Sequence, residues 1–128
     1  MLPLYIHPFV NFYIIIHYFN LKSNTLFTNA VKLVKANLSH AHKIELECDT
    51  LEQIKEALPL GVDIIMLDNM TLEQMKEAVE LINHRATVEA SGNVHLDTVR
   101  KIAECGVDII SSSAIVAKAP TLDVALDM

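Results

Sequence analysis

The segment Asp63-Ile64-Ile65-Met66-Leu67-Asp68-Asn69 decides the fold, because it is a short apolar run that ends abruptly in a carboxylate and an amide. Successive apolar residues without alternation are typical of a strand buried on both faces, as in a parallel sheet covered by helices. A charged side chain at the end of such a strand requires a cleft or a polar partner. Asp68 is therefore the first candidate for a functional residue.

Strand and helix signals alternate along the chain from residue 26 onward. The predicted strands are Lys43–Cys48, Asp63–Asp68, Ala86–Glu89 and Asp108–Ile110. Helical spacing of apolar residues, together with capping residues, predicts helices over 26–38, from Asp49 or Thr50 to Pro59, from Thr71 to Ile82, and over Asp97–Cys105. Such alternation is typical of β-α units that form a parallel sheet.

The polar residues at the strand ends recur at a nearly constant interval. Glu47, Asp68, Glu89 and Ser111 are separated by 21, 21 and 22 residues. Right-handed crossovers make neighbouring strands parallel, so all four polar ends are expected at one edge, where ligands bind in α/β sheets and barrels. The sequence therefore predicts an α/β fold. Because about four strands cannot close an eight-stranded barrel, we expect a partial parallel (β/α) barrel, with about four β-α units of a TIM-like open barrel.

The beginning of the chain has a different composition. All seven Phe and Tyr residues lie within the first 27 positions, and residues 1–42 contain no Asp or Glu. Polar residues and prolines interrupt the apolar segment Leu2–Phe19, so it fits neither a membrane-spanning helix nor a signal peptide. We predict an irregular apolar leader over residues 1–25, not native to the fold, followed by one domain over residues 26–128. The alternatives are a buried strand or helical turn at Phe12–Phe19, or adhesion to a membrane surface.

The charge of the regular part restricts the class of ligand. Residues 43–128 carry 16 acidic and seven basic side chains, a net charge of −9. This balance argues against nucleic acid, whose backbone binds clustered Lys and Arg. A phosphorylated small molecule would need backbone N–H groups, a metal ion or basic residues from elsewhere. Cys48 and Cys105 have neither metal-ligand nor redox spacing, so we predict reduced core thiols of a cytosolic protein.

The strand ends combine side chains and loops that suit a ribose phosphate. Alternation places Glu45 and Glu47 on the same side of their strand. Carboxylates there could chelate Mg²⁺, act as general acid and base, or accept hydrogen bonds from vicinal sugar hydroxyls. The small turns Ser91–Asn93 and Ser111–Ser113 would let backbone N–H groups approach a phosphate closely. The alternative is that Asp49 only caps a helix and that the serines are ordinary loop residues.

Four motifs in this order resemble a known enzyme family. They are IELECDTLEQ (44–53), IIMLDNM (64–70), VEASGN (88–93) and GVDIIS (106–111). Together they closely resemble the C-terminal half of the catalytic domain of quinolinate phosphoribosyltransferase, also called carboxylating nicotinate-nucleotide pyrophosphorylase. The resemblance covers roughly residues 28–128.

The resemblance implies a cytoplasmic enzyme of NAD and pyridine nucleotide biosynthesis. Members of the family are glycosyltransferases that transfer a phosphoribosyl group from phosphoribosyl pyrophosphate to quinolinate and decarboxylate the product. The products are nicotinate mononucleotide, CO₂ and pyrophosphate, and Mg²⁺ is required. The family fold pairs an N-terminal sandwich with an open barrel. Its members are homodimers or larger assemblies that share active sites.

The resemblance also implies roles for eight residues. Glu47 and Asp68 match the acids that hold the ribose hydroxyls and help to orient Mg²⁺ through pyrophosphate or water, without binding the metal directly. The residues that match the loops around the 5′-phosphate are Ser91, Gly92, Asn93, Ser112, Ser113 and Ala114. No catalytic residue is assigned.

The chain departs from the family pattern in two places. Many members have Val-Gly-Ala and a nearby His in the last loop, where this chain has Ser112-Ser113-Ala114 and Ala117. The basic residues that bind the quinolinate carboxylates and pyrophosphate come from the family's sandwich and first barrel strands, and residues 1–27 contain no matching motif. We therefore expect an incomplete chain, from a truncated or frame-shifted gene. The alternatives are an inactive fragment that retains only ribose-phosphate binding, and a paralogue that acts on another ring acid.

Overall fold

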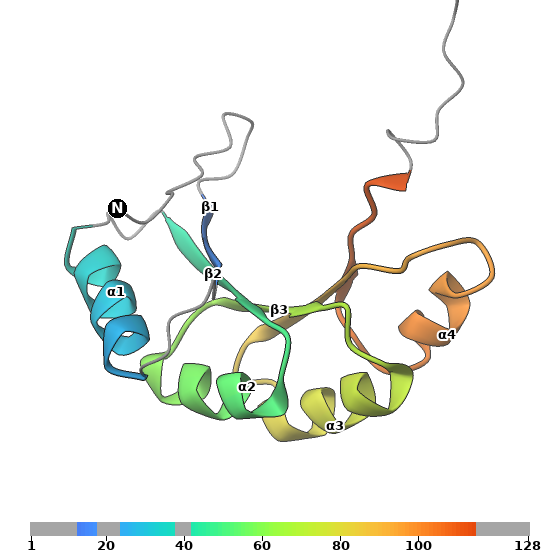
Figure 1. Ribbon diagram of the computed structural model, residues 1–128, viewed down its shortest axis with the longest axis horizontal. Coiled ribbons are helices and arrows are strands. Elements are labelled where there is room, and N and C mark those ends of the chain that lie inside the picture. The colour runs from blue at the N-terminus through green and yellow to red at the C-terminus, as the bar shows by residue number, and fades with distance from the viewer. Residues whose placement is uncertain (1–12, 18–23, 38–41, 115–128) are drawn as a thin grey trace, which may run out of the picture.

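The computed structural model describes residues 13–17, 24–37 and 42–114, and these form one parallel sheet with helices along its outer side (Figure 1). The five strands lie in the order β1-β2-β3-β4-β5, and every pair is parallel. The strands are β1 (Tyr13–His17), β2 (Lys43–Cys48), β3 (Ile64–Asp68), β4 (Thr87–Ser91) and β5 (Ile109–Ile110). The helices are α1 (Asn24–Asn37), α2 (Leu51–Ala57), the 3₁₀ helix η1 (Leu58–Leu60), α3 (Leu72–Ile82) and α4 (Val99–Ala103).

The predicted partial α/β barrel is confirmed, and the sheet contains one strand more than predicted. The additional strand is β1, which pairs with β2 from Tyr13↔Lys43 to His17↔Glu47. It lies inside the segment predicted as a leader. The alternative prediction of a strand within Phe12–Phe19 therefore agrees with the structure. Most of residues 1–25 lie outside the described residues, so the domain boundary at residue 25 stays a prediction.

Local capping signals explain where the central helices begin and end. Thr50 and Thr71 each accept a hydrogen bond from the backbone N–H three residues later, and Gln53 and Gln74 accept from the cap N–H in return. Thr50, rather than Asp49, is therefore the cap of α2. At the other end, Gly61 has φ 60°, a left-handed conformation that suits glycine.

Alternation along the strands divides their side chains between two faces. The outward residues Leu46, Cys48, Ile65 and Leu67 are fully buried in the apolar core beneath the helices. Ile44, Val88 and Ala90 belong to the same core. The residues that alternate with them, Glu45, Glu47, Met66 and Glu89, point to the inner face, which the helices leave uncovered (Figure 1). Glu45 and Glu47 thus lie on the same side of their strand, as predicted.

The two cysteines are free and buried, as predicted for core thiols. Burial, with the nearby Asp49 and other carboxylates, raises the pKa of the Cys48 thiol to about 12. Burial also raises the pKa of Cys105. Both thiols therefore stay protonated near neutral pH, which makes them poor nucleophiles.

The sequence Gly-Val-Asp-Ile-Ile occurs twice, at residues 61–65 and 106–110, and its aspartate has a structural role at the edge of the sheet where the strands begin. The Asp63 Oδ2 atom accepts a hydrogen bond from the Ile44 N–H at 2.8 Å, and Asp108 Oδ2 accepts from the Val88 N–H at 2.8 Å. Each carboxylate therefore joins the start of its own strand to the strand beside it. The two copies of the repeat perform the same task in two β-α units.

Replacing Asp63 or Asp108 by Ala should destabilise the chain by about 1–3 kcal/mol, because a buried backbone N–H loses its charged acceptor. Asp63→Asn should cost less, since its amide oxygen still accepts. Urea unfolding at constant pH measures the difference. Asp97→Ala, at an exposed residue in the loop before α4, is the control. Equal stability of Asp63→Ala and the control would contradict the assigned role.

The inner face carries an unusual carboxyl group at Glu45. Its side chain is 5% exposed, and among the described residues its Oε1 atom has no hydrogen-bond partner. Burial, followed by repulsion from Glu89 and then Glu47, raises its pKa from 4.5 to about 7. The neutral form of Glu45 is therefore the form that the fold prefers.

Because the pKa of Glu45 rises on folding, its ionisation should cost stability as the pH increases from about 4.5 through about 7. Glu45→Gln keeps the neutral shape and should remove this loss, on the order of 1–3 kcal/mol at about pH 8. The measurement is the urea midpoint across this pH range. Glu77→Gln, at an exposed residue of α3, is the matched control. A wild-type pH profile that Glu45→Gln leaves unchanged would disprove this account.

Candidate functional site

A pocket of about 390 Å³ lies at the carboxyl ends of β3, β4 and β5. Seven of the eight predicted site residues line it, and Glu47 does not. The lining residues are Asp68, Ser91, Gly92, Asn93, Val94, His95, Ser111, Ser112, Ser113 and Ala114. The structure therefore brings the two predicted loops and one of the two predicted acids to one place.

The register of the strands explains the position of Glu47. Asp68 pairs with Ser91 at the ends of β3 and β4, whereas Glu47 pairs with Met66, which in turn pairs with Glu89. Glu47 and Glu89 therefore lie two positions deeper along the sheet. The prediction that Glu89 ends its strand was wrong, because β4 continues to Ser91. The interval of about 21 residues is the length of one β-α unit along the chain. It does not place the four residues at the same height in the sheet, because neighbouring strands are offset from one another.

Asp68 is joined to the neighbouring loop through the side chain of Asn69. The Asn69 Nδ2 atom donates to Asp68 Oδ2 at 3.0 Å, and Asn69 Oδ1 accepts from Asn93 Nδ2 at 3.3 Å. Asn69 and Asn93 both have φ 53°, a left-handed conformation that asparagine tolerates better than most residues. The side chain of Asn69 was not among the predicted site residues, although its position directly after Asp68 was a signal.

Gly92 is required here for two reasons. Its φ of 82° is unfavourable for a residue with a side chain, and a Cβ atom at this position would overlap the amide oxygen of Asn69. The sequence predicted that a small residue would allow a phosphate to approach. The structure shows that it allows the Asn69 side chain to approach.

Two hydroxyl groups hold the loops around the pocket. Thr98 Oγ1 donates to the backbone oxygen of Asn93 at 2.9 Å, and Ser112 Oγ donates to that of Val94 at 3.3 Å. The helix predicted over Asp97–Cys105 is shorter, since α4 begins at Val99 and Thr98 binds back to the loop instead of capping it. Ser112 thus connects the loop after β4 to the loop after β5.

The backbone N–H groups of the pocket differ in what they bind. The Ala114 N–H donates to Ser112 Oγ at 3.2 Å, so it is already used. Within the described part of the chain, no hydrogen bond engages the N–H groups of Gly92, Asn93 or Ser113. N–H groups in a turn of this kind bind anions.

The described residues contain no group of three His, Cys, Asp or Glu side chains that could hold a metal ion. None of the described helices is both long enough and apolar enough to cross a membrane.

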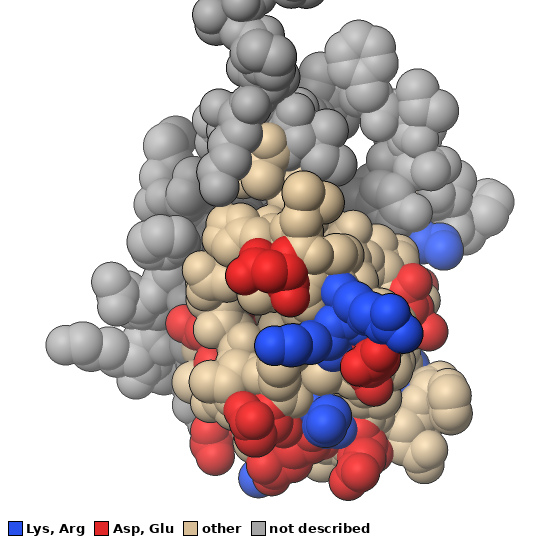
Figure 2. All heavy atoms as spheres, turned by 90° about the vertical axis from the view of Figure 1, so that its right-hand side faces the viewer, with Lys and Arg blue, Asp and Glu red and all other residues tan. Residues whose placement is uncertain are grey.

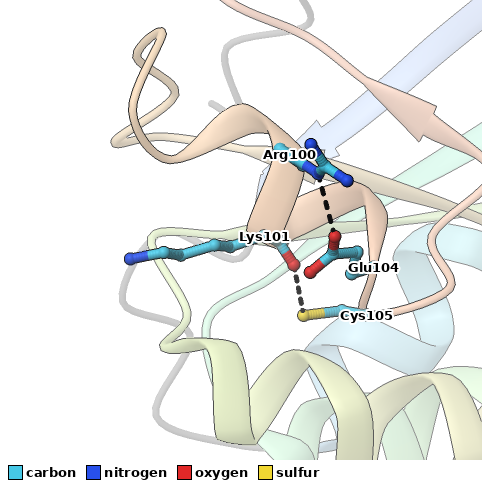
Figure 3. Close-up of polar contacts among 4 residues, drawn as sticks. All are labelled: Arg100, Lys101, Glu104 and Cys105. Atoms are coloured by element: carbon cyan, nitrogen blue, oxygen red, sulfur yellow. Dashed lines mark hydrogen bonds and ion pairs between the residues drawn. The ribbon is translucent and has the colours of Figure 1, made fainter.

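The surface beside α4 mixes both signs of charge (Figure 2). Arg100 Nε lies 3.1 Å from Glu104 Oε1 across one turn of this helix, and both side chains are largely exposed (Figure 3). Below them, Cys105 Sγ donates to the backbone oxygen of Lys101 at 3.2 Å (Figure 3). An exposed pair of this kind contributes little to stability. In Figure 2 the Lys and Arg side chains of this face lie next to Asp and Glu side chains.

Solved structures with similar sequences share the fold of this chain. The nicotinate-nucleotide pyrophosphorylase from Ehrlichia chaffeensis is 36% identical with a TM-score of 0.74, over 81% of this chain and 38% of that chain. NadC from Streptococcus pyogenes is 32% identical with a TM-score of 0.75, over 85% of this chain and 38% of that chain.

Curated proteins with similar sequences carry the same enzyme name as the solved structure from Ehrlichia chaffeensis. A probable nicotinate-nucleotide pyrophosphorylase [carboxylating] from Synechocystis sp. is 44% identical over 104 residues, which are 79% of this chain and 35% of the relative. One from Methanocaldococcus jannaschii is 35% identical over 106 residues, covering 77% of this chain and 38% of the relative. The chain thus spans little more than a third of the length of these relatives.

The family model for the C-terminal domain of quinolinate phosphoribosyl transferase matches residues 15–127. This match begins inside the segment predicted as a leader and includes part of β1. It covers all four motifs that carry the resemblance in the sequence. The chain therefore belongs to the quinolinate phosphoribosyltransferase family.

Proposed function

We propose that this chain forms the ribose-5-phosphate end of an enzyme that transfers a phosphoribosyl group from phosphoribosyl pyrophosphate to quinolinate. Decarboxylation then gives nicotinate mononucleotide, CO₂ and pyrophosphate. One observation carries the proposal: a single pocket is lined by a carboxylate and by two loops that carry N–H groups, in a chain of this family. A ribose phosphate offers matching groups, with hydroxyl donors at one end and an anion at the other.

Asp68 is the residue proposed to bind the ribose. Its carboxylate is half-buried at the end of β3, and it can accept hydrogen bonds from two vicinal hydroxyls at once. Sugar transfer passes through a transition state with positive charge on the ring. The carboxylates of Glu47 and Glu89, one row deeper on the same face, would add favourable negative potential to that of Asp68.

The 5′-phosphate is proposed to bind the loops after β4 and β5. The N–H groups of Gly92, Asn93 and Ser113 point to this role, since no acceptor in the described part of the chain uses them. The family resemblance also assigned Ser112 and Ala114 to the phosphate. In our proposal these two residues shape the loop, because they hydrogen-bond to each other and to Val94.

The other substrate groups need residues of a kind that the described lining of the pocket lacks. Among the described residues that line it there is neither Lys nor Arg. Quinolinate and pyrophosphate are polyanions, which proteins bind with basic side chains. We propose that these bind residues corresponding to the rest of the relatives' length, and that the active enzyme is a cytoplasmic homodimer or larger assembly.

Mg²⁺ is proposed to bind at this site together with the substrate. It keeps several waters and binds through one or two carboxylates together with substrate phosphates. Asp68 and Glu47 would hold it through water or pyrophosphate, and the ion would neutralise phosphate charge when bound.

A narrower function is ribose-phosphate binding without catalysis. The acidic inner face, and a described pocket lining without Lys or Arg, favour it for this chain by itself. A paralogue that acts on another ring acid would use the same pocket, because the ring acid would contact other residues. Turnover of quinolinate by the 128-residue chain would exclude the narrower function.

Titration with phosphoribosyl pyrophosphate and Mg²⁺ should shift the NMR signals of the Gly92, Asn93 and Ser113 amides. Asp68→Asn should weaken binding roughly ten-fold, because it replaces an ionised acceptor for the hydroxyls. The control is Glu77→Gln on the exposed face of α3, which should bind as the wild type does. If these amides do not respond to saturating ligand, the proposal fails.

A further inference from the structure

The amide of Asn69 contacts both halves of the pocket. Its nitrogen donates to the carboxylate of Asp68 at 3.0 Å, and its oxygen accepts from the Asn93 amide at 3.3 Å. Asn69 and Asn93 lie 24 residues apart in the sequence and follow different strands. One small side chain therefore connects the carboxylate proposed for ribose with the loop proposed for phosphate.

The side-chain amide of Asn69 can make both contacts because it carries a donor and an acceptor. Asp68 requires a donor, because an ionised carboxylate is only an acceptor, and the Asn93 nitrogen requires an acceptor. An aspartate at position 69 would offer oxygen to both neighbours and would oppose the charge of Asp68. It would fit the same space and tolerate the same φ of 53°, so this substitution changes the chemistry and retains the shape.

The structure of the neighbouring loop depends on the same side chain. The Asn69 backbone N–H donates to Ser91 O at 3.0 Å, which fixes the residue beside the loop. Gly92 passes so close to the Asn69 amide oxygen that no side chain fits between them. The loop from Ser91 to Asn93 is thus built around Asn69.

We propose that Asn69 is a positioning residue that fixes the Asp68 carboxylate relative to the Ser91–Asn93 loop, so that the two ends of a ribose phosphate bind as one unit. This inference rests on the proposed function. Its consequence is selective: losing Asn69 should affect a ligand that contacts both ends more than a ligand that contacts only the loop. A residue with a merely structural role would weaken both ligands equally.

The test compares ribose 5-phosphate with inorganic phosphate on the 128-residue chain, using calorimetry and amide shifts. Asn69→Asp should weaken ribose 5-phosphate roughly ten-fold and phosphate less than about three-fold, as expected for one hydrogen bond to a charged group. The matched control is Asn83→Asp, because Asn83 also has a left-handed φ, 45°, and is exposed at the end of α3. It should change neither affinity.

A double variant tests whether Asn69 acts on ribose 5-phosphate binding through the Asp68 carboxylate. In an Asp68→Asn background, Asn69→Asp should cost less than in the wild type, because its action passes through the Asp68 carboxylate. If Asn69→Asp does not fold, Asn93→Gly removes the other contact and retains the left-handed φ of 53°, and the same selectivity is expected.

The outcomes separate the two proposals. Equal losses for both ligands, or no loss for either, would overturn the role of Asn69 and leave the proposed function intact. A wild-type chain that binds neither ribose 5-phosphate nor phosphate would overturn the proposed function, and the role of Asn69 with it.

Discussion

The structure depends on the parallel pairing of β2, β3 and β4 in one register. Their outward side chains, such as Leu46, Ile65 and Leu67, are fully buried beneath the helices. A shift of one residue would exchange these side chains with the polar residues of the inner face, so the core strongly selects the observed register. The same register places Asp68 beside Ser91. Core packing on the outside of the sheet thus positions the polar groups of the pocket.

The inner face of the sheet and the pocket at its edge differ in charge. Glu47 and Glu89 place negative charge on the inner face, and burial, together with repulsion from these two carboxylates, raises the pKa of Glu45 to about 7. The described lining of the pocket at the edge contains N–H groups for an anion and includes neither Lys nor Arg. This combination supports the proposed site for the sugar and its phosphate, and in that proposal pyrophosphate and quinolinate bind other residues. The span of little more than a third of the relatives' length agrees with this division.

The sequence predicted the features that depend on local signals. Thr71 and Gln74 start α3 because both capping partners lie within one turn, and the apolar run before Asp68 forms β3. It could not predict the stagger, because a constant interval along the chain does not specify the register between strands. It also missed the tertiary role of Gly92, which depends on an Asn69 side chain from another β-α unit. The helix α4 is shorter than predicted, and Thr98 donates to the loop oxygen of Asn93, five residues earlier, instead of capping the helix with its side chain.

A crystal structure of the chain with ribose 5-phosphate would test the central claim most directly. The account predicts phosphate oxygens within hydrogen-bond distance, about 2.7–3.2 Å, of the N–H groups of Gly92, Asn93 and Ser113. It also predicts ribose hydroxyls that donate to the Asp68 carboxylate, with Asn69 still joined to Asp68 and Asn93. A sugar phosphate bound elsewhere, or bound here with its hydroxyls turned away from Asp68, would contradict it.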